Sequence, residues 1–251
     1  MITSILYLPD YSGIEARLIA EASGEQELID LFVNDPVNAD PHSITAEMFY
    51  DKIFTDQNTC FKFFKQEDDF KKLQKTLRGA AKNAFFAKAY IAKLPKLLKT
   101  LMLTYEQAEQ GYERFRQRWP KVFYYSETVM KEAQEKGYIE TPFGPYMYAP
   151  KDQMYILGNY KIQHMAAKIL KHAIVKCHYY YREAFNGEVK IILDIHDELV
   201  IKFPRKFLPR EQEFIENTIR LMTDCKEVRV PLSVEWKKTT TTWADAKEIE
   251  I

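Results

Sequence analysis

Two aspartates that lie nearly two hundred residues apart both follow apolar, strand-like runs. The first run, residues 5–9, leads into Asp10. Residues 190–195 and 198–203 flank the His196-Asp197 step, where a tight hairpin turn is expected. Helix-like segments fill the interval between the two aspartates. Helices inserted between strands that come together late predict an α+β domain with an antiparallel sheet.

A helix-like segment in the interval carries a row of cations and aromatic side chains. The row consists of Arg78, Lys82, Phe86 and Tyr90. Its members are four residues apart, which places them along one side of a helix. Residues 71–99 hold nine Lys or Arg and no Asp or Glu, although the net charge of the chain is zero. Such a stripe suits a polyphosphate, and the aromatics suit a base or sugar. On spacing alone, a solvated amphipathic helix is the more common explanation.

The functional interpretation of Asp10 and Asp197 depends on their combination with that helix. Taken singly, each is more often a turn or cap residue. Phosphoryl transfer requires a divalent metal held against the triphosphate, and magnesium prefers one or two carboxylates together with phosphate oxygens and water. Two neighbouring carboxylates repel each other, and a cation between them keeps both ionised. The combination predicts a Mg²⁺ site that handles a nucleoside triphosphate.

Length and cysteine content narrow the class of protein. A chain of 251 residues forms one large domain or two small ones. Cys60, Cys177 and Cys225 are scattered, so neither a zinc site nor a disulfide framework is expected. No apolar run approaches the length of a membrane span, and Met1 leads directly into a strand rather than a signal peptide. We expect a soluble protein that works in a reducing cytoplasm.

Local signals predict the remaining elements. Helices are expected over residues 14–23, 25–33, 42–50, 71–92, 104–118, from 120 onward, 159–184 and 209–222. Thr104 is the expected N-cap of its helix, with Gln107 completing a capping box. A small hairpin is expected at residues 138–148 and a last strand at 232–236. Residues 51–70 show no clear period and are expected to be irregular.

Several segments together resemble the family A DNA polymerases, the class of bacterial polymerase I and many phage replicases. Residues 10–17 (DYSGIEAR) resemble motif A, DYSxxExR. Residues 78–90 resemble motif B, RxxxKxxxFGxxYG, and residues 195–200 (IHDELV) resemble motif C, VHDELV. Weaker likenesses lie at residues 40–46, 138–144, 159–163 and 230–243. The matches follow the family order across nearly the whole chain.

The resemblance implies roles for individual residues in a two-metal, DNA-directed nucleotidyl transfer. The implied catalytic residues are Asp10, Asp197 and Lys82, and the implied Mg²⁺ ligands are Asp10, Asp197 and Glu198. The implied nucleotide-binding residues are Tyr11, Glu15, His42, Arg78, Phe86 and Tyr90. The implied DNA-binding residues are Asn159, Gln163 and His196. Among these, Lys82 is the candidate proton donor to pyrophosphate, and Glu15 is the candidate gate against a 2′-hydroxyl.

The implied organisation is a palm sheet with an inserted helical fingers subdomain, without thumb or exonuclease domains. Residues 1–41 are expected to be palm with motif A, residues 42–158 fingers with the basic helix, and residues 159–251 palm again. The expected ligands are primer–template DNA and deoxynucleoside triphosphates. Because the chain starts at motif A, a second polypeptide is expected to carry the thumb and the first part of the palm. The expected location is the cytoplasm of a bacterial host or phage-infected cell, without a membrane.

Some positions depart from the family pattern and leave alternatives open. Gly79 stands where a second Arg is common, Ala87 and Ile91 replace both motif B glycines, and residues 145–147 replace an arginine run. The lost motif B glycines and the missing thumb favour a second hypothesis, a non-catalytic nucleic-acid-binding or assembly subunit. A third is a relative of the single-subunit RNA polymerases, against which Glu15 and Glu198 point to DNA.

Overall fold

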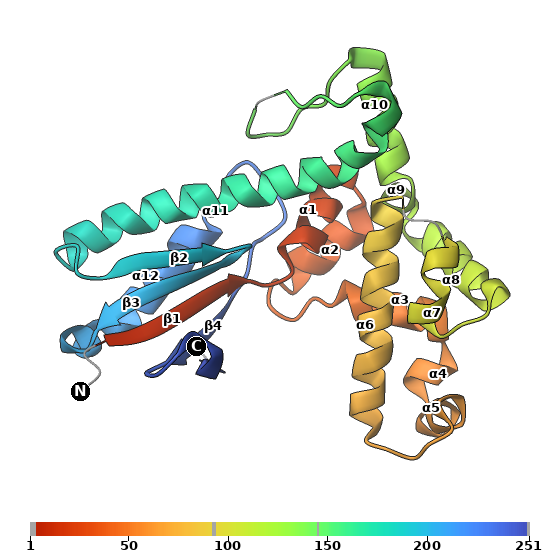
Figure 1. Cartoon of the computed structure of the whole chain (residues 1–251), viewed down its shortest axis with the longest axis horizontal. Coiled ribbons are helices and arrows are strands. Elements are labelled where there is room, and N and C mark those ends of the chain that lie inside the picture. The colour runs from red at the N-terminus through yellow and green to blue at the C-terminus, as the bar shows by residue number, and fades with distance from the viewer. Residues whose placement is uncertain (1–3, 92–93, 145, 250–251) are drawn as a thin grey trace. The chain divides into compact units, whose positions relative to one another are not determined.

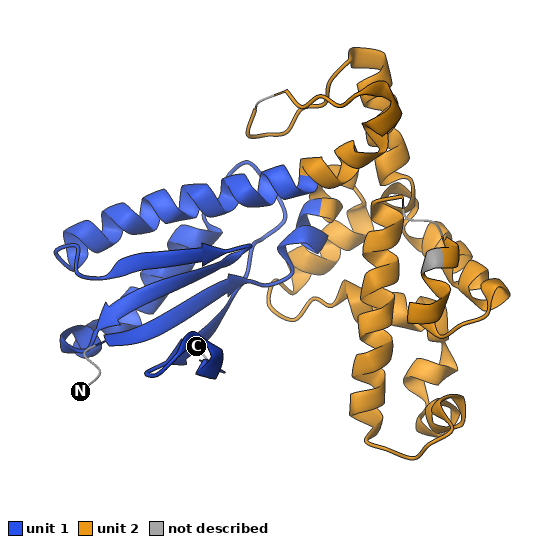
Figure 2. Cartoon of the chain, viewed as in Figure 1, with its two compact units in different colours: residues 1–18, 162–251 blue, residues 19–161 orange. Residues whose placement is uncertain are grey.

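The computed structural model describes residues 4–91, 94–144 and 146–249. The chain divides into two compact units, coloured separately in Figure 2. Unit 1 contains residues 1–18 and 162–251, and unit 2 contains residues 19–161. Among the described residues, no helix has both the length and the apolar character needed to span a membrane.

Unit 1 is built on an antiparallel sheet with the strand order β2-β3-β1-β4-β5 (Figure 1). The strands are β1 (Ser4–Tyr11), β2 (Lys190–Ile195), β3 (Glu198–Pro204), β4 (Val234–Thr239) and β5 (Lys247–Glu248). The first strand lies between two strands from the other end of the chain, since it pairs with both β3 and β4. The predicted α+β class with an antiparallel sheet is therefore confirmed.

One face of this sheet is covered by aromatic side chains and two helices. The helices are α11 (Leu157–Ala184), which begins in unit 2 and continues into unit 1, and α12 (Glu211–Thr223). The ring of Phe214 on α12 lies at the centre of an aromatic cluster. Its ring neighbours are Tyr7, Tyr181, Phe185, Phe203 and Trp236, at centroid distances of 4.7–6.2 Å. Burial of these large rings supplies much of the apolar area that holds unit 1 together.

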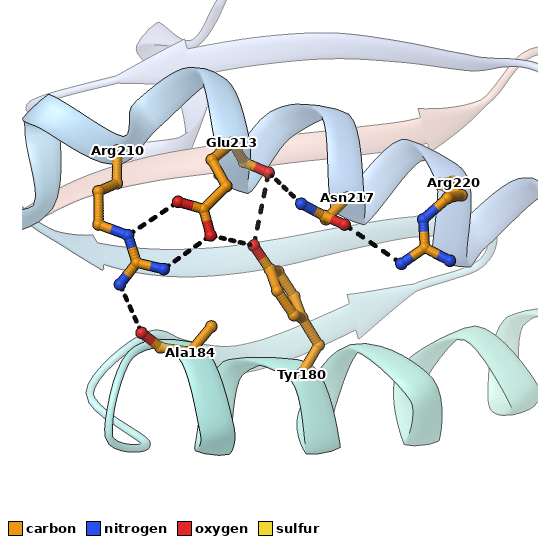
Figure 3. Close-up of polar contacts among 6 residues, drawn as sticks. All are labelled: Tyr180, Ala184, Arg210, Glu213, Asn217 and Arg220. Carbon is orange, nitrogen blue, oxygen red and sulfur yellow. Dashed lines mark hydrogen bonds and ion pairs between the residues drawn. The ribbon is translucent and has the colours of Figure 1, made fainter.

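Polar contacts fix the end of α11 against the start of α12 (Figure 3). Arg210 donates from Nε and Nη2 to the two carboxylate oxygens of Glu213, at 2.8 and 2.7 Å, and from Nη1 to the carbonyl of Ala184 at 2.6 Å. The hydroxyl of Tyr180 lies 3.4 Å from Glu213. The Ala184 carbonyl belongs to the last turn of α11, where carbonyl groups lack helical partners. The two helices are thereby joined on one side of the sheet.

Unit 2 is helical. Its elements are α2 (Gln26–Asn34), α3 (Pro41–Tyr50), α4 (Lys52–Thr55), α5 (Gln57–Phe64), α6 (Phe70–Ala89), α7 (Leu98–Leu101), α8 (Tyr105–Arg118), α9 (Pro120–Phe123) and α10 (Tyr125–Lys136), while α1 (Ile14–Ser23) crosses the boundary between the units. Short 3₁₀ turns lie at Leu94–Lys96, Lys151–Ile156, Arg205–Arg210 and Trp243–Asp245. The core contains the rings of Phe85, Phe115 and Trp119, which meet at 5.5–6.0 Å.

Most predicted elements are found, and three differ. Residues 51–70 contain the helices α4 and α5, so the prediction of an irregular segment is wrong. These helices are short and owe their position to the burial of Phe54 and Cys60 and to an N-cap at Asp56. Among the described residues of the segment 138–148, the expected hairpin is reduced to one bridge between Ile139 and Met147. The last long strand is β4, displaced toward the C-terminus from the predicted 232–236.

Candidate functional site

Asp10 lies in a row of carboxylates across three strands of unit 1. It is directly opposite Glu198 on β3 and Glu235 on β4. Side chains that are directly opposite each other on neighbouring strands lie on the same face of the sheet. Because side chains alternate along β1, Asp10 lies on one face and Tyr7 lies on the other. Like charges paired in this way are destabilising. The row is therefore a place where a bound cation lowers the energy of the fold.

Asp197 lies in the two-residue loop between β2 and β3. His196, the other loop residue, has a φ of 56°, a left-handed conformation that histidine tolerates better than most side chains. The carbonyl of Asp197 accepts a 3.3 Å hydrogen bond from the N–H of Tyr11, so the loop is held beside the end of β1. The hairpin and β1 thus bring the two aspartates of the sequence prediction into the same region of unit 1.

The electrostatics of Asp10 match those of a cation-binding carboxylate. Burial first, and then the charges of Asp197, Glu198 and Glu235, together raise the pKa of Asp10 to about 6 against the opposing charge of Lys237. Its Oδ1 is buried and makes no hydrogen bond within the described residues. No group of three His, Cys, Asp or Glu forms a ready metal cage in the described chain. Magnesium usually binds one or two protein carboxylates and completes its coordination with water and phosphate oxygens, so the carboxylates around Asp10 fit this ion.

Two residues that the sequence prediction missed complete the surroundings of these carboxylates. The Nζ of Lys237 lies 3.8 Å from Oδ2 of Asp10 and 3.4 Å from Oε2 of Glu198. The indole Nε1–H of Trp243 donates to Oε1 of Glu198 at 2.9 Å. Alternation along β4 places Glu235 and Lys237 on the face of Asp10. That signal was hidden because the predicted strand stopped one residue before Lys237.

The other motif A residues serve the packing of β1 and α1. Tyr11 is buried, and its hydroxyl donates to the carbonyl of Met222 at 2.7 Å. Arg17 is also buried, and it donates to the carbonyls of Ser12 and Pro231 at 2.8 and 2.6 Å. Glu15 is in the first turn of α1. Among the motif A side chains predicted to bind nucleotide, Tyr11 thus has its polar atom directed to the protein interior.

In unit 2, Asp40 joins the start of α3 to the basic helix α6. The two oxygens of Asp40 accept hydrogen bonds from Nε and Nη2 of Arg78 at 2.7 and 2.9 Å. The same carboxylate caps α3, because it accepts from the N–H groups of His42 and Ser43, both at 3.1 Å. Burial alone raises the pKa of Asp40, but Arg78 and Ser43 outweigh this effect and hold it at about 2. Asp40 is ionised at any physiological pH.

The remaining members of the α6 row follow Arg78 along the helix. Lys82 is exposed, with its Nζ 6.0 Å from the centroid of the Phe86 ring. The rings of Phe86 and Tyr90 stack at 6.1 Å with an interplanar angle of 16°. The helical spacing predicted from the sequence therefore places the two cations Arg78 and Lys82 on α6, followed by an aromatic stack between Phe86 and the C-cap residue Tyr90. Planar rings of this kind suit a sugar or a base.

His42 is buried beside this row. Its ring lies 5.5 Å from that of Phe85 and 5.4 Å from that of Phe86. Burial lowers the pKa of His42 to about 4, and the charges of Arg78 and Lys82 contribute. The imidazole is therefore neutral at pH 7, and its buried Nδ1 makes no hydrogen bond within the described residues.

Motif B departs from the family pattern within α6 and just after its last residue. Ile91 has a φ of 58°, in the left-handed region that a β-branched residue rarely adopts. The family pattern has glycine at this position, which enters the left-handed region without strain. Gly79, where a second Arg is common, faces open space, so its lack of a side chain leaves no packing defect. The backbone at Ile91 thus has the left-handed conformation that glycine adopts easily, and the isoleucine side chain makes this conformation strained.

The residues predicted to bind DNA lie on different parts of the chain. Asn159 is in the first turn of α11 within unit 2, with its Oδ1 buried and unbonded among the described residues. Gln163, on the next turn and in unit 1, is exposed. His196 is exposed at the tip of the β2–β3 hairpin. Two of the three side chains are therefore open to a ligand.

Comparisons with known proteins agree with these motifs. The sequence profile of DNA polymerase family A matches residues 3–245. The chain is 28% identical over 241 residues to the thermostable DNA polymerase I of Thermus aquaticus and 29% identical over 258 residues to DNA polymerase I of Lactococcus lactis. These alignments cover 92% and 97% of this chain and 26% of each relative. The chain belongs to DNA polymerase family A, and it spans about a quarter of the length of these relatives.

A solved structure has the same fold. It is the POL domain of Pol1 from M. smegmatis, in complex with DNA primer-template and dNTP. The TM-score is 0.75 at 24% sequence identity, over 94% of this chain and 39% of that one. The two chains therefore share the arrangement of the sheet and helices.

Proposed function

We propose that this chain carries out DNA-directed deoxynucleotidyl transfer, as the palm and fingers of a family A DNA polymerase. The observation that carries the proposal is the row of carboxylates around Asp10, which lies directly opposite Glu198 and Glu235 and beside the loop that holds Asp197. Like charges directly opposite each other destabilise a sheet, and a cation bound among them offsets this repulsion. Family membership adds the expectation that the cation serves nucleotide chemistry.

Asp10, Asp197 and Glu198 are the residues that would hold magnesium, in a two-metal arrangement. When bound, the ions neutralise the developing charge on the phosphates and orient the attacking and leaving oxygens. The protein itself fixes the carboxylates on a rigid sheet, with the Asp197 loop held to β1 by the hydrogen bond from Tyr11. Such rigidity limits the reorganisation needed during the reaction.

The α6 row is the proposed grip on the incoming nucleotide. Asp40 engages Nε and Nη2 of Arg78, which leaves the Nη1 amine for a phosphate oxygen. Lys82 is exposed and can neutralise the phosphates and donate a proton from Nζ to the departing pyrophosphate. Phe86 and Tyr90 would pack against the sugar and the new base pair. His42, being neutral, would act by hydrogen bonding rather than by charge.

Glu15 is the proposed discriminator against ribonucleotides, and Asn159, Gln163 and His196 are the proposed DNA contacts. The proposed subdomains are palm at residues 1–41 and 159–251 and fingers at residues 42–158. A second polypeptide that carries the thumb is part of the proposal. It is supported by Ile192 and Leu193, which are 52% and 51% exposed on the edge strand β2, because apolar edges of this kind invite a partner.

Primer extension tests the proposal. The chain, alone and with co-purifying proteins, is given a primed template, Mg²⁺ and four deoxynucleotides. Extension should fall by a factor of a thousand or more in Asp10→Asn and Asp197→Asn, since each removes a metal ligand. Asp194→Asn is the matched control, because Asp194 is an exposed carboxylate of the same hairpin. Full extension by Asp197→Asn would refute the proposal.

A non-catalytic nucleic-acid-binding subunit is the second candidate, and Ile91 is the observation that favours it. A side chain that strains the end of α6 restricts rearrangement of this helix end during turnover. Under this hypothesis the chain binds primed DNA but gives no extension with any partner, and it shows no magnesium-dependent binding of deoxynucleoside triphosphate. Binding of the triphosphate with release of pyrophosphate would exclude it.

A further inference from the structure

Lys237 occupies an unusual position among the carboxylates of unit 1. It lies on β4, two residues after Glu235 and opposite Leu8 of β1, and its side chain shares the face of Asp10. Its ammonium is within 4 Å of Asp10 and of Glu198. A cation supplied by the protein therefore lies among the groups that would bind magnesium.

Glu198 is held at both oxygens. Trp243 donates to Oε1 at 2.9 Å, and Lys237 approaches Oε2 at 3.4 Å. The Glu198 side chain is only 11% exposed, so water replaces these partners poorly. For Glu198 to bind a metal ion through Oε2, the ammonium has to move aside or share this oxygen. Asp10 differs, since its Oδ2 lies near Lys237 while its buried Oδ1 has no hydrogen bond within the described residues.

We infer that Lys237 is a built-in counter-cation that competes with divalent metal for Asp10 and Glu198 and so sets the metal affinity of the site. The inference rests on the proposed function, because it takes these carboxylates as metal ligands. The ammonium offsets part of the negative charge of the carboxylates and holds them in place before an ion arrives. It then repels the incoming ion and must give up its contacts, so the price of this preorganisation is a weaker affinity for metal.

Lys238, the next residue along β4, provides a control that distinguishes competition with the metal ion from a general effect of positive charge. Lys238 lies on the opposite face of β4, where its Nζ is 3.1 Å from Oε1 of Glu211. Glu211 also accepts a hydrogen bond from Tyr7, on the face that packs against the helices. Lys238 has the same charge, strand and kind of partner as Lys237. It differs in facing away from the proposed metal site, which makes it the matched control.

Direct titration with Mn²⁺ tests the inference without measuring activity. Free Mn²⁺ is followed by electron paramagnetic resonance for the full chain and for Lys237→Met, Lys237→Arg, Lys238→Met and Asp197→Asn. Lys237→Met should bind Mn²⁺ roughly tenfold more tightly, because a positive charge close to the ion is removed. Lys237→Arg, which keeps the charge, and Lys238→Met should remain within about twofold of the unchanged chain.

The other outcomes overturn the inference. Equal or weaker Mn²⁺ binding by Lys237→Met would show that Lys237 does not compete with the metal ion and that its ion pairs only stabilise the structure of the site. If the unchanged chain shows no Mn²⁺ binding that Asp197→Asn weakens, the metal site fails, and the proposed function fails with the inference. If a thermal melt shows that Lys237→Met is unfolded, Lys237→Gln is titrated with Mn²⁺ in its place, and the same changes in affinity are expected.

Discussion

Asp40 holds Arg78 in place with the same carboxylate that begins helix α3. Its oxygens accept two hydrogen bonds from the guanidinium, at 2.7 and 2.9 Å, and two more from the backbone N–H groups of His42 and Ser43. Paired hydrogen bonds between Arg and a carboxylate fix the plane of the guanidinium as well as its position. The proposed phosphate-binding cation is therefore oriented before a ligand arrives.

Replacing Asp40 by Asn should weaken the binding of deoxynucleoside triphosphate about fivefold to tenfold, because the Arg78 guanidinium loses its charged, two-point support. Fluorescence titration with a labelled triphosphate gives the dissociation constant. Asp56→Asn is the control, since Asp56 caps α5 by accepting from the N–H of Thr59 at 2.8 Å. Tighter binding by Asp40→Asn would instead mean that the carboxylate masks Arg78.

The buried His42 should make stability fall as the solution is acidified. Its folded-state pKa of about 4 lies below the ordinary 6.5, so the unfolded chain binds the proton more tightly. The stabilisation is complete above pH 6.5 and is lost as the pH falls toward 4. The full effect is roughly 3 kcal/mol, from 1.36 kcal/mol for each pKa unit.

Urea unfolding of the unchanged chain and of His42→Gln at pH 7.0, 5.5 and 4.5 isolates this loss, because the raised pKa of Asp10 acts in the opposite direction in both chains. His42→Gln should show a smaller fall in the free energy of unfolding over the interval, whereas the exposed His178→Gln should follow the unchanged chain. The loss from Asp40 is separate, because its pKa of about 2 places its contribution at lower pH. Identical pH profiles for His42→Gln and the unchanged chain would contradict the prediction.

Ile91→Gly should stabilise the chain by about 1 kcal/mol. Its φ of 58° strains a β-branched side chain, and removal of that strain outweighs the added freedom of glycine in the unfolded chain. Ala87→Gly, within α6, is the paired control and should destabilise by about 1 kcal/mol. Chemical denaturation measures both changes, and a destabilised Ile91→Gly would show that the isoleucine contributes packing that exceeds the strain.

Phe214→Ala should destabilise unit 1 by about 3 to 5 kcal/mol, because it opens a cavity among five aromatic neighbours. Tyr179→Ala removes an aromatic ring that is 58% exposed on α11, and it should change stability by less than about 1 kcal/mol. Thermal unfolding followed by circular dichroism compares the two variants. Similar losses for both would show that the cluster around Phe214 does not dominate the stability.

Local chemistry explains which elements could be predicted from the sequence. The helix from Tyr105 to Arg118 has both hydrogen bonds of the expected capping box, between Thr104 and Gln107. The β2–β3 hairpin follows from two apolar runs and a two-residue loop. These signals lie within a few residues of each other. The packing of α4 and α5 depends instead on contacts such as that of Gln74 with the carbonyl of Phe54, twenty residues away in the chain.

In the candidate site, too, residues in local sequence motifs could be predicted, whereas residues brought in by long-range contacts could not. The motif residues Asp10 and Asp197 could be chosen from sequence, and their proposed roles stay predictions. Lys237 and Trp243 could not be chosen, because their importance arises only from the register of β4 against β1 and from a contact between Trp243 and Glu198. The Asp40–Arg78 pair likewise joins two helices over 38 residues. A single sequence does not encode such distances in its local pattern.

The strand order β3-β1-β4 delays the folding of unit 1 during synthesis. β1 is synthesised before the other strands of its sheet, and both of its pairing partners come from the last third of these 251 residues. At typical elongation rates of about 5–20 residues per second, β1 waits roughly 10 to 40 seconds for β3. During that interval unit 2 can complete its own packing, whereas an apolar strand remains without its sheet. Within unit 1, residues 4–11 are therefore the segment most exposed to aggregation or chaperone capture, before the carboxylates of the sheet have been brought together.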